Sequence, residues 1–457
     1  MDVSARFRLD ETVPNGTATL WIPGASMDFE STSMEMLIAS TSRATLGVVG
    51  VGRPAVLILL TLMAPHPANR SATTSLAAGA DLTVHEWGTF TTVAGRDGRA
   101  LEWLPLGGPT DLPCFVEHFQ NRPNVKLAPN QPVPLDYTAA RSSLWGKVRM
   151  ETPVLYFYAS RPTQVNVRVR FPRGLMTEWY PRATVSQPLA DRMTLRRGPL
   201  ESVIEWPHVT VEPNAAQRFP VGAGESHYYA ARNTNAAPLV VDGQREKFLF
   251  YRGVASFDVP LSADVLPDGR VRVRNLGADA LLTAILFENR NGIVRYAVHG
   301  AFREEAVLEL PARVGSVAHI RGDLELTLVE AGLYPKEAAA MVESWRDSWF
   351  EEGTRAFYIV PPKAVDAVLP LTVEPVPARV VRVFVGRMEL ITPDIERTVE
   401  TAVIANDATV LERYGRFLGP ITDRILAAHP DAVTKHRTRN ATNAAFAAFV
   451  RRVTTCE

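Results

Sequence analysis

The chain has 457 residues, of which 49 are Lys or Arg and 49 are Asp or Glu. This balance gives a formal net charge of zero, which removes any overall electrostatic attraction to nucleic acid or to an anionic membrane. The chain is 46% apolar with ordinary amounts of Gly and Pro, so collagen-like and disordered chains are excluded, and its length allows about three domains.

The basic residues are mostly arginine, since only six are lysines and the remaining 43 are arginines. The planar guanidinium group suits the recognition of carboxylates and phosphates. The arginines are nevertheless scattered along the chain, a distribution that favours a bias in codon usage over one functional cluster. The two cysteines, Cys114 and Cys456, allow at most one internal disulfide.

The first 80 residues are typical of an export signal rather than of a folded domain. Ala55–Ala64 is an apolar run that is too short to cross a bilayer of about 30 Å as a helix but suits the centre of a secretory signal. Arg43 and Arg53 precede the run, and Ala78-Gly79-Ala80 follows it in an A-x-A arrangement. We therefore expect export to the periplasm or the extracellular space, with residues 1–80 as a leader.

The beginning of the chain fits a signal poorly, because residues 1–33 are acidic. We expect translation to begin at Met34 or Met36 instead, which N-terminal sequencing of the mature protein tests. The alternative is an uncleaved N-terminal anchor. No cysteine precedes Cys114, which excludes a lipid-modified cysteine anchor. We expect no integral membrane domain in the mature chain.

Residues 81–330 are predicted to form antiparallel β structure. The run 154–159 is rich in β-forming residues and the run 164–171 alternates apolar with polar residues, so the two predict a hairpin with one buried face. Many short strands without helical periodicity between them indicate a β-sandwich region of one or two modules. Three dipeptides are expected to form tight hairpin turns. They are Asp242-Gly243, Asp268-Gly269 and Asn291-Gly292.

Residues 331–457 are predicted to form a mixed α/β, helix-rich domain. A helical pattern begins at Pro335 and ends at Gly353, and its apolar positions include Trp345 and Trp349, which are expected to pack in the core. The other predicted elements are strands at 357–360 and 380–385 and helices from Thr392 and at 408–418, 420–428 and 440–453.

His85 and Glu86 place an imidazole next to a carboxylate, a pair that suits metal binding or acid-base catalysis. Consecutive side chains of a strand point to opposite faces, so the two converge only if a bulge intervenes. The alternative is a structural histidine with a hydrogen-bond partner at a strand edge.

Cys114 and His118 suit a nucleophilic thiol. If Pro113 begins a helical turn, Cys114 lies in the first turn, where the helix dipole lowers the pKa of a thiol, and His118 lies on the same face. An exported thiol tends to be oxidised, however, so a disulfide between Cys114 and Cys456 is the alternative.

Two further patterns combine polar and aromatic residues. Ser226 lies in a near match to the nucleophile elbow of serine hydrolases and is followed by His227, but Tyr228 occupies the position that requires glycine. Glu178 is followed by Trp179, a combination that sugar-binding sites use. The alternatives are a loop or capping role for Ser226 and core packing for the aromatic residues. The tryptophans considered with Glu178 are Trp87, Trp103 and Trp206.

Five segments resemble those of uncharacterised exported bacterial proteins. The segments are HEWGTFTTVAG from His85, ETPVLYFY from Glu151, SHYYAARNT from Ser226, EKFLFYRG from Glu246 and GLYPKEAAAMVESWRDSWFEEG from Gly332. The resemblance implies export and one shared architecture after residue 82, and it implies no particular activity, cofactor or catalytic residue.

The sequence therefore predicts an exported binding or assembly module for a saccharide or protein ligand. The sequence has no Walker loop, dinucleotide fingerprint, EF-hand loop or paired CxxC motif that would indicate a nucleotide, flavin, calcium or zinc-ribbon site. The rival hypothesis is a secreted hydrolase that acts on saccharide or peptide. Its candidate catalytic residues are His85, Glu86, Cys114, His118, Glu178 and His227. The candidate metal ligands are His85, His118 and His227.

Overall fold

The computed structural model describes residues 81–107, 112–119, 143–188, 195, 200–216, 218–222, 224–429 and 431–451. The predicted leader and Cys456 lie outside these residues, so the leader, the start site and the pairing of Cys456 stay predictions. The described part is mainly β, with one mixed sheet and two antiparallel sheets, which confirms the predicted predominance of strands. Among the described residues, we find no helix with the length and apolarity to cross a membrane.

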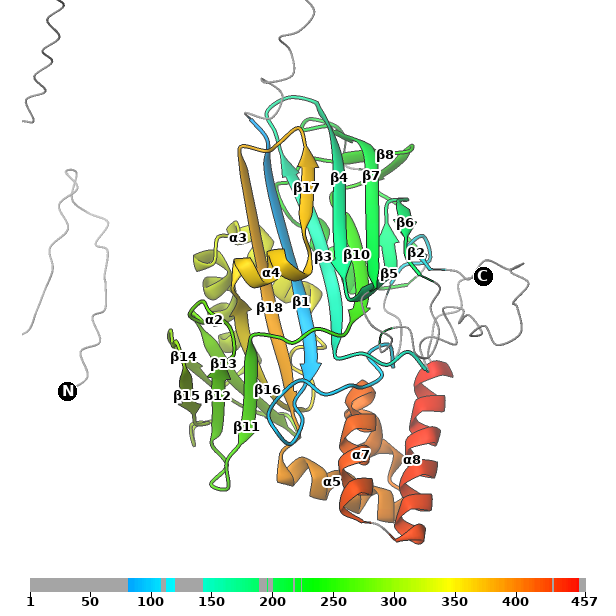
Figure 1. Cartoon of the computed structure of the whole chain (residues 1–457), viewed down its shortest axis with the longest axis vertical. Coiled ribbons are helices and arrows are strands. Elements are labelled where there is room, and N and C mark those ends of the chain that lie inside the picture. The colour runs from blue at the N-terminus through cyan, green and yellow to red at the C-terminus, as the bar shows by residue number, and fades with distance from the viewer. Residues whose placement is uncertain are drawn as a thin grey trace, which may run out of the picture. The chain divides into compact units, whose positions relative to one another are not determined.

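A nine-stranded sheet forms the centre of the fold (Figure 1). Strands β1 and β18 pair in parallel in the middle of this sheet, and every other neighbouring pair is antiparallel. In spatial order, the strands are β14 (Ile293–His299), β13 (Ala284–Arg290), β16 (Gly353–Val360), β18 (Arg379–Leu390), β1 (Thr83–Val93), β3 (Val148–Tyr158), β10 (Leu249–Ala255), β5 (Gly174–Tyr180) and β2 (Glu117–His118).

Two smaller sheets accompany the central one. The first comprises β17 (Leu371–Glu374), β4 (Thr163–Pro172), β7 (Glu201–Val211), β8 (Leu239–Val241) and β9 (Gln244–Glu246), with β6 (Thr184–Ser186) paired to β7. The second comprises β11 (Leu261–Val265), β12 (Val271–Asn275) and β15 (Glu305–Leu308). The three predicted turns connect β8 to β9, β11 to β12 and β13 to β14, which confirms them as hairpin turns.

The predicted hairpin of residues 154–159 and 164–171 is wrong, because these residues lie in different sheets. β3 belongs to the nine-stranded sheet and β4 to the six-stranded one, and the chain crosses between them at residues 159–162. β3 is buried on both faces, whereas β4 is buried only at alternate positions, as its sequence pattern predicts. The two strands, although consecutive in the sequence, therefore belong to two sheets that share an apolar core and do not pair with each other through backbone hydrogen bonds.

The two faces of the nine-stranded sheet have different partners. One face shares an apolar core with the six-stranded sheet, and Trp206 of β7 packs there against Tyr251 of β10. The other face, which we call the helical face, is covered by three helical elements with a second apolar core. These elements are η2 (His227–Arg232), α2 (Val317–Glu330) and α3 (Pro335–Ser344).

The predicted helix from Pro335 to Gly353 is correct only in its first half. Helix α3 ends at Ser344, and Trp345 and Trp349 lie in the irregular segment that leads to β16. Both tryptophans are buried, as expected, and their rings are stacked 6.4 Å apart. Apolar spacing alone does not distinguish a continuous helix from a turn that places the same side chains on one core.

Further helices follow the central sheet in the sequence, and several of them group at one end of the strands (Figure 1). Thr392 caps α5 by accepting a hydrogen bond from the Ile395 amide, which confirms the predicted helix start. Their apolar core includes Trp103 and Phe417. These helices are α5 (Pro393–Ala405), α6 (Ala408–Arg413), η3 (Gly415–Phe417), α7 (Leu418–Ala428) and α8 (Ala432–Arg451). A separate helix, α4 (Pro362–Val368), lies between β16 and β17 in the sequence and packs on the core between the sheets.

The predicted boundary at residue 330 runs through the nine-stranded sheet. β16 and β18 follow this boundary in the sequence, yet they lie between β13 and β1, which precede it. The described residues on both sides of this boundary belong to one compact unit by their contacts. The strands on both sides of residue 330 therefore share one core.

Candidate functional site

His85 and Glu86 point to opposite faces of the nine-stranded sheet, as the alternation of a strand requires. His85 is buried on the helical face, where its Nδ1 lies 2.7 Å from Glu337 Oε2 of α3. Glu86 is buried on the other face, where Tyr251 donates to Oε1 and Arg382 donates to Oε2, each at 2.5 Å. The two candidate catalytic groups therefore do not converge on one substrate.

The Glu337 carboxylate contacts three groups from different elements, and His85 is one of them. Besides its contact with His85, it accepts the Tyr158 hydroxyl at 2.8 Å and the Tyr334 amide at 2.8 Å. The His85 ring also stacks on the Tyr334 ring, with 4.5 Å between the ring centroids. Burial and the nearby Glu337 carboxylate raise the pKa of Tyr158 well above its usual value. This cluster holds α3 against β1 and β3, which favours the structural alternative for His85.

Cys114 does not have the environment predicted for a nucleophilic thiol. Residues 113–116 form a turn, closed by a hydrogen bond from the Val116 amide to the Pro113 carbonyl, and β2 begins at Glu117, so the predicted helical turn is wrong. The sulfur of Cys114 is disulfide-bonded and not a free thiol. Cys456 lies outside the described residues.

His118 and Glu178 are the two candidate residues that the fold brings together. They are opposite each other on β2 and β5, and Arg252 of β10 lies opposite Glu178 on its other side. Glu178 is buried and accepts a hydrogen bond from the Thr177 hydroxyl. The row places a carboxylate between an imidazole and a guanidinium group.

His227 begins the short helix η2, and its Nε2 lies 2.7 Å from Asp347 Oδ2. Ser226 caps this helix by accepting a hydrogen bond from the Tyr228 amide at 3.2 Å. This contact confirms the capping role for Ser226. The tryptophans considered with Glu178 pack in the core, as the alternative interpretation predicted, since Trp87, Trp103 and Trp206 are all buried.

A small cavity lies on the helical face beneath Trp345, between β3, β10, η2 and the end of α3. It has room for about one water molecule. Its polar lining includes Thr152, Arg252 and His227, and its apolar lining includes Tyr228 and Phe250. All of its lining residues lie in four of the five segments that carry the resemblance described above. They are Thr152, Val154, His227, Tyr228, Ala231, Phe248, Phe250, Arg252, Ser344 and Trp345.

The backbone around this cavity is irregular for a reason visible in the sequence. β3 carries an extra residue relative to both neighbouring strands at Thr152-Pro153, because proline cannot donate a hydrogen bond to the ladder. Thr152 has a φ of 43°, which is strained for a β-branched residue. Its side chain is buried, and its Oγ1 has no hydrogen-bond partner among the described residues. Strain and bulges of this kind often occur at functional sites.

Other buried side chains of the helical face also carry polar atoms without a described partner, among them His85 and Trp87, and we group four of the others with Thr152. We call Thr89, Thr152, Trp345, Trp349 and Arg387 the donor layer. Within the described part of the chain, no acceptor lies in hydrogen-bond reach of Thr89 Oγ1, Trp345 Nε1, Trp349 Nε1, or Arg387 Nε and Nη1. Leaving such groups buried and unpaired costs roughly 1–3 kcal/mol each, which calls for an explanation.

Strand register places the members of the donor layer on neighbouring strands. Thr89 of β1 lies opposite Glu151 of β3, next to Thr152, and Trp345 lines one cavity with Thr152. Arg387 of β18 lies opposite Thr91, two residues from Thr89, and opposite Phe357 of β16, whose ring packs 5.5 Å from the Trp349 ring. The stacked pair of Trp345 and Trp349 thus extends from Thr152 to the strand neighbour of Arg387.

A buried ionic network borders the donor layer. Thr91 donates to Glu151 at 3.0 Å, and Arg149 and Arg416 form ion pairs with the same carboxylate. Burial alone would raise the pKa of Glu151, but Arg416, Arg149 and Arg387 outweigh burial and hold it below its usual value. Glu151 therefore stays ionised at neutral pH.

Arg387 belongs to both the ionic network and the donor layer. Its Nη2 donates to Glu351 at 2.7 Å and to Glu389 at 3.2 Å, and Glu389 also pairs with the buried Arg355. Burial lowers the pKa of Arg387, but Glu351 and Glu389 outweigh burial and raise it. The Arg387 guanidinium is thus a permanent, fully buried positive charge with unused N–H groups.

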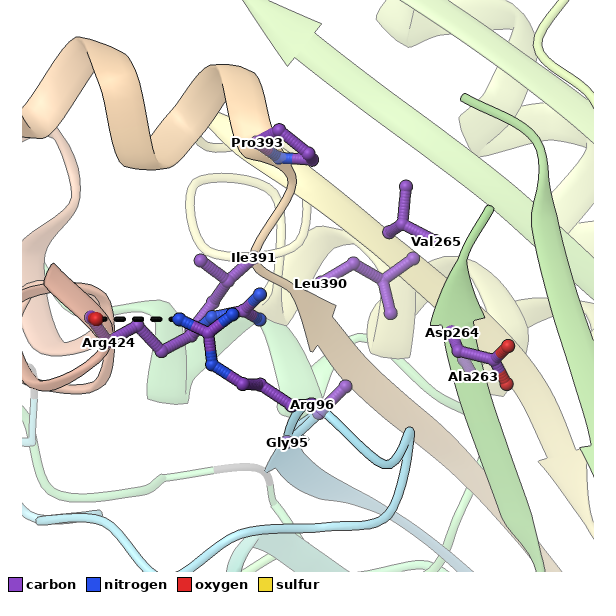
Figure 2. A pocket seen from close by; sticks show the side chains of 10 residues that line it. Gly95, Arg96, Ala263, Asp264, Val265, Leu390, Ile391, Pro393 and Arg424 are labelled. Carbon is purple, nitrogen blue, oxygen red and sulfur yellow. Dashed lines mark hydrogen bonds between the residues drawn. The ribbon is translucent and has the colours of Figure 1, made fainter. Parts of the chain in front are cut away.

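A wider pocket lies where the loop after β1 meets β11, the end of β18, α5 and α7 (Figure 2). Arg96 and Arg424 approach each other there, and Arg96 donates to the Arg424 carbonyl at 3.5 Å. Arg424 is paired with Glu396, and Asp264 accepts hydrogen bonds from the arginines of β12. Because the protein already partners Arg424 and Asp264, this pocket is a weaker candidate than the donor layer.

The candidate metal ligands do not form a metal site in the described structure. His85, His118 and His227 lie in three separate surroundings, and the described residues contain no group of three or more side chains suited to a metal ion. Sequence reasoning missed the threonines, tryptophans and arginine of the donor layer. Pro153 inside a strand-like run was the available signal, because a central proline indicates a bulge.

Searches with protein-family models and among curated proteins find no match to this chain.

Proposed function

We propose that this chain is an exported binding module, built on a β-sandwich with a helix-rich C-terminal part, which binds a polar ligand beneath Trp345 and Trp349. The donor layer is the observation that carries the proposal. Its buried N–H and O–H groups have no acceptor among the described residues, and a bound ligand with oxygen acceptors would complete them. The aromatic rings beside the donors supply apolar contact area for the rest of the ligand.

The arrangement of the candidate catalytic residues favours binding over hydrolysis. His85 and Glu86 are separated by the sheet, and Cys114 is disulfide-bonded. His227 lies at the cavity, but its described partner is Asp347, and the nearby Ser226 hydroxyl caps a helix. A hydrolase needs a nucleophile or an activated water beside an acid-base group. The described contacts do not assemble such a group.

The cavity beside Thr152 and Trp345 holds about one water molecule, and its lining does not include Thr89, Trp349 or Arg387. The segment that carries Trp345 and Trp349 therefore has to move for a larger ligand to reach these donors. Binding should therefore change the surroundings of the tryptophans and order the segment between α3 and β16. We propose a saccharide or a peptide side chain as the ligand, and either one requires this movement of the tryptophans.

Export rests on the apolar run Ala55–Ala64 and its basic flank. Cell fractionation followed by N-terminal sequencing of the native protein tests it. We expect a mature chain outside the cytosol that begins after residue 64. A cytosolic chain with residues 55–64 intact contradicts export.

Ligand binding is tested by screening saccharides, peptides and small organic acids against the full chain with tryptophan fluorescence and thermal unfolding. The screen uses the unchanged protein, Trp349→Phe and Trp103→Phe. Trp103 is an equally buried control, because its Nε1 already donates to the Lys147 carbonyl at 3.2 Å. We expect ligand binding that Trp349→Phe weakens and Trp103→Phe leaves unchanged. Turnover of a saccharide or peptide in the same screen would support the hydrolase instead.

A further inference from the structure

We propose that the ligand of the donor layer carries an oxyanion, a carboxylate, sulfate or phosphate group, which Arg387 receives through Nε and Nη1. This inference rests on the proposed function, because it names the chemical class of ligand for the same site. Two features of the site support it independently. The first is the kind of hydrogen-bonding group that is left over, and the second is the balance of charge.

The leftover groups are mainly donors. Tryptophan Nε1 and the arginine nitrogens can only donate, and the threonine hydroxyls can donate as well as accept. Such a set suits a ligand with several acceptor oxygens and few donors. Donor groups on Arg387, Thr89 and Trp349 come from three different elements of the helical face, with Arg387 opposite Thr91, two residues from Thr89. An oxyanion offers acceptor positions in several directions, which matches donors that approach from different sides.

The ion pairs beside the donor layer form two neighbouring groups, which together leave one positive charge without a carboxylate. Arg387 and Arg355 pair with Glu351 and Glu389, so their charges balance. Arg149 and Arg416 share Glu151 alone, so the excess positive charge belongs to this second group. An uncompensated buried charge is costly, so a bound monoanion would stabilise this part of the fold.

Arg387 is held in a fixed orientation for such a ligand. Phe417 stacks with Arg387 and with Arg416, at 4.9 and 5.0 Å from the guanidinium carbons to the ring centroid. This stacking covers a face of the Arg387 guanidinium group, while Glu351 and Glu389 hold Nη2. The Nε and Nη1 hydrogens lie in the guanidinium plane and stay available for an acceptor. A water molecule could satisfy one of them but would leave the excess charge uncompensated.

The test is isothermal titration of the full chain with inorganic phosphate, sulfate and acetate at constant ionic strength, with chloride as the control anion. We expect at least one oxyanion to bind with a stoichiometry of one. Thr89→Val should weaken this binding by about tenfold, because it removes one hydrogen bond to a charged group. Arg387→Lys should abolish it, since lysine keeps the charge but lacks the Nε and Nη1 hydrogens.

Thr438→Val is the matched control, because Thr438 of α8 also has a buried hydroxyl without a described partner but belongs to the C-terminal helices. It should leave anion binding unchanged. If Arg387→Lys fails to fold, Thr89→Val against Thr438→Val still decides the outcome. Equal binding by these two variants overturns the assignment to the donor layer. Binding of a neutral ligand without any oxyanion overturns the inference and leaves the proposed function standing, whereas failure of every ligand in both screens overturns both.

Discussion

Thr89 and Thr91 lie two residues apart on β1 and point to the same face of the sheet, yet their hydroxyls differ. The Thr91 hydroxyl donates to Glu151 at 3.0 Å, whereas Thr89 Oγ1 has no partner among the described residues. Both side chains are fully buried. The contrast separates a residue that stabilises the fold from one that is poised for a ligand.

The free energy of unfolding without ligand should respond differently to the two isosteric variants. Thr89→Val should be neutral or slightly stabilising, because it removes an unsatisfied hydroxyl. Thr91→Val should cost about 1–3 kcal/mol, because it deprives the buried Glu151 carboxylate of a donor. Urea unfolding of both variants measures this difference. Equal destabilisation by the two would show that the Thr89 hydroxyl has a structural partner.

Glu151 provides a prediction for the pH dependence of stability. Its folded pKa lies below the usual value of 4.5, so its ionisation stabilises the fold above about pH 4.5, and this contribution is lost as the pH falls through the folded pKa. Glu151→Gln should therefore cost about 3–5 kcal/mol at pH 7, because the arginines lose their partner. The gap between the variant and the unchanged protein should narrow below pH 4.5. Urea unfolding from pH 7 to pH 3 tests this, and a constant gap contradicts it.

At the level of elements, β1 and α3 are joined by one buried cluster. Glu337 of α3 contacts His85 of β1 and accepts the hydroxyl of Tyr158 from β3. This contact fixes helix α3, which ends just before Trp345, and Trp345 lines the cavity next to Thr152. The position of Trp345 therefore depends on the Glu337 carboxylate near the start of the same helix.

Glu337→Gln should lower the free energy of unfolding by about 1.5–3 kcal/mol, because it removes a charged acceptor from buried hydrogen bonds. It should also speed hydrogen exchange in α3. Glu343→Gln on the same helix is the control, since its pairs with Arg321 and Arg346 are partly exposed and such pairs contribute about 0–1 kcal/mol. If both variants lose the same free energy of unfolding, the loss comes from removing a negative charge from α3 and not from breaking the contacts around His85.

The sequence predicts the elements with local signals well. The dipeptide turns, the alternation of β4 and the cap at Thr392 all follow from residues next to one another. The end of α3 and the partner of β3 were missed, because packing at long range decides them. The donor layer was missed for the same reason. Threonine, tryptophan and arginine form no motif, and only the register of β1, β3 and β18 brings them together.

At the level of the whole molecule, the parallel pairing of β1 with β18 connects the first and the last strand of the described chain. The pairing runs from Thr83 opposite Arg379 to Val93 opposite Glu389. No periodicity within either strand predicts such a partner. The separate C-terminal domain expected from residue 331 onward therefore contributes two central strands to the sheet of the preceding region.

A chain shortened to residues 81–330 lacks β16 and β18, so β1 would expose a long, unpaired edge. We expect this shortened chain to aggregate or to unfold without a sharp transition, whereas residues 81–457 should unfold in one main transition. Circular dichroism during heating and size-exclusion chromatography measure both properties. A monomeric 81–330 chain with a sharp transition would contradict the shared core.

A ligand that completes the buried donors beside Trp345 and Trp349 should be visible in a high-resolution crystal structure of the full chain grown with phosphate. We expect a non-protein acceptor within about 3.2 Å of Arg387 Nε or Nη1 and of Thr89 Oγ1. Protein groups or water molecules alone at these donors would contradict it.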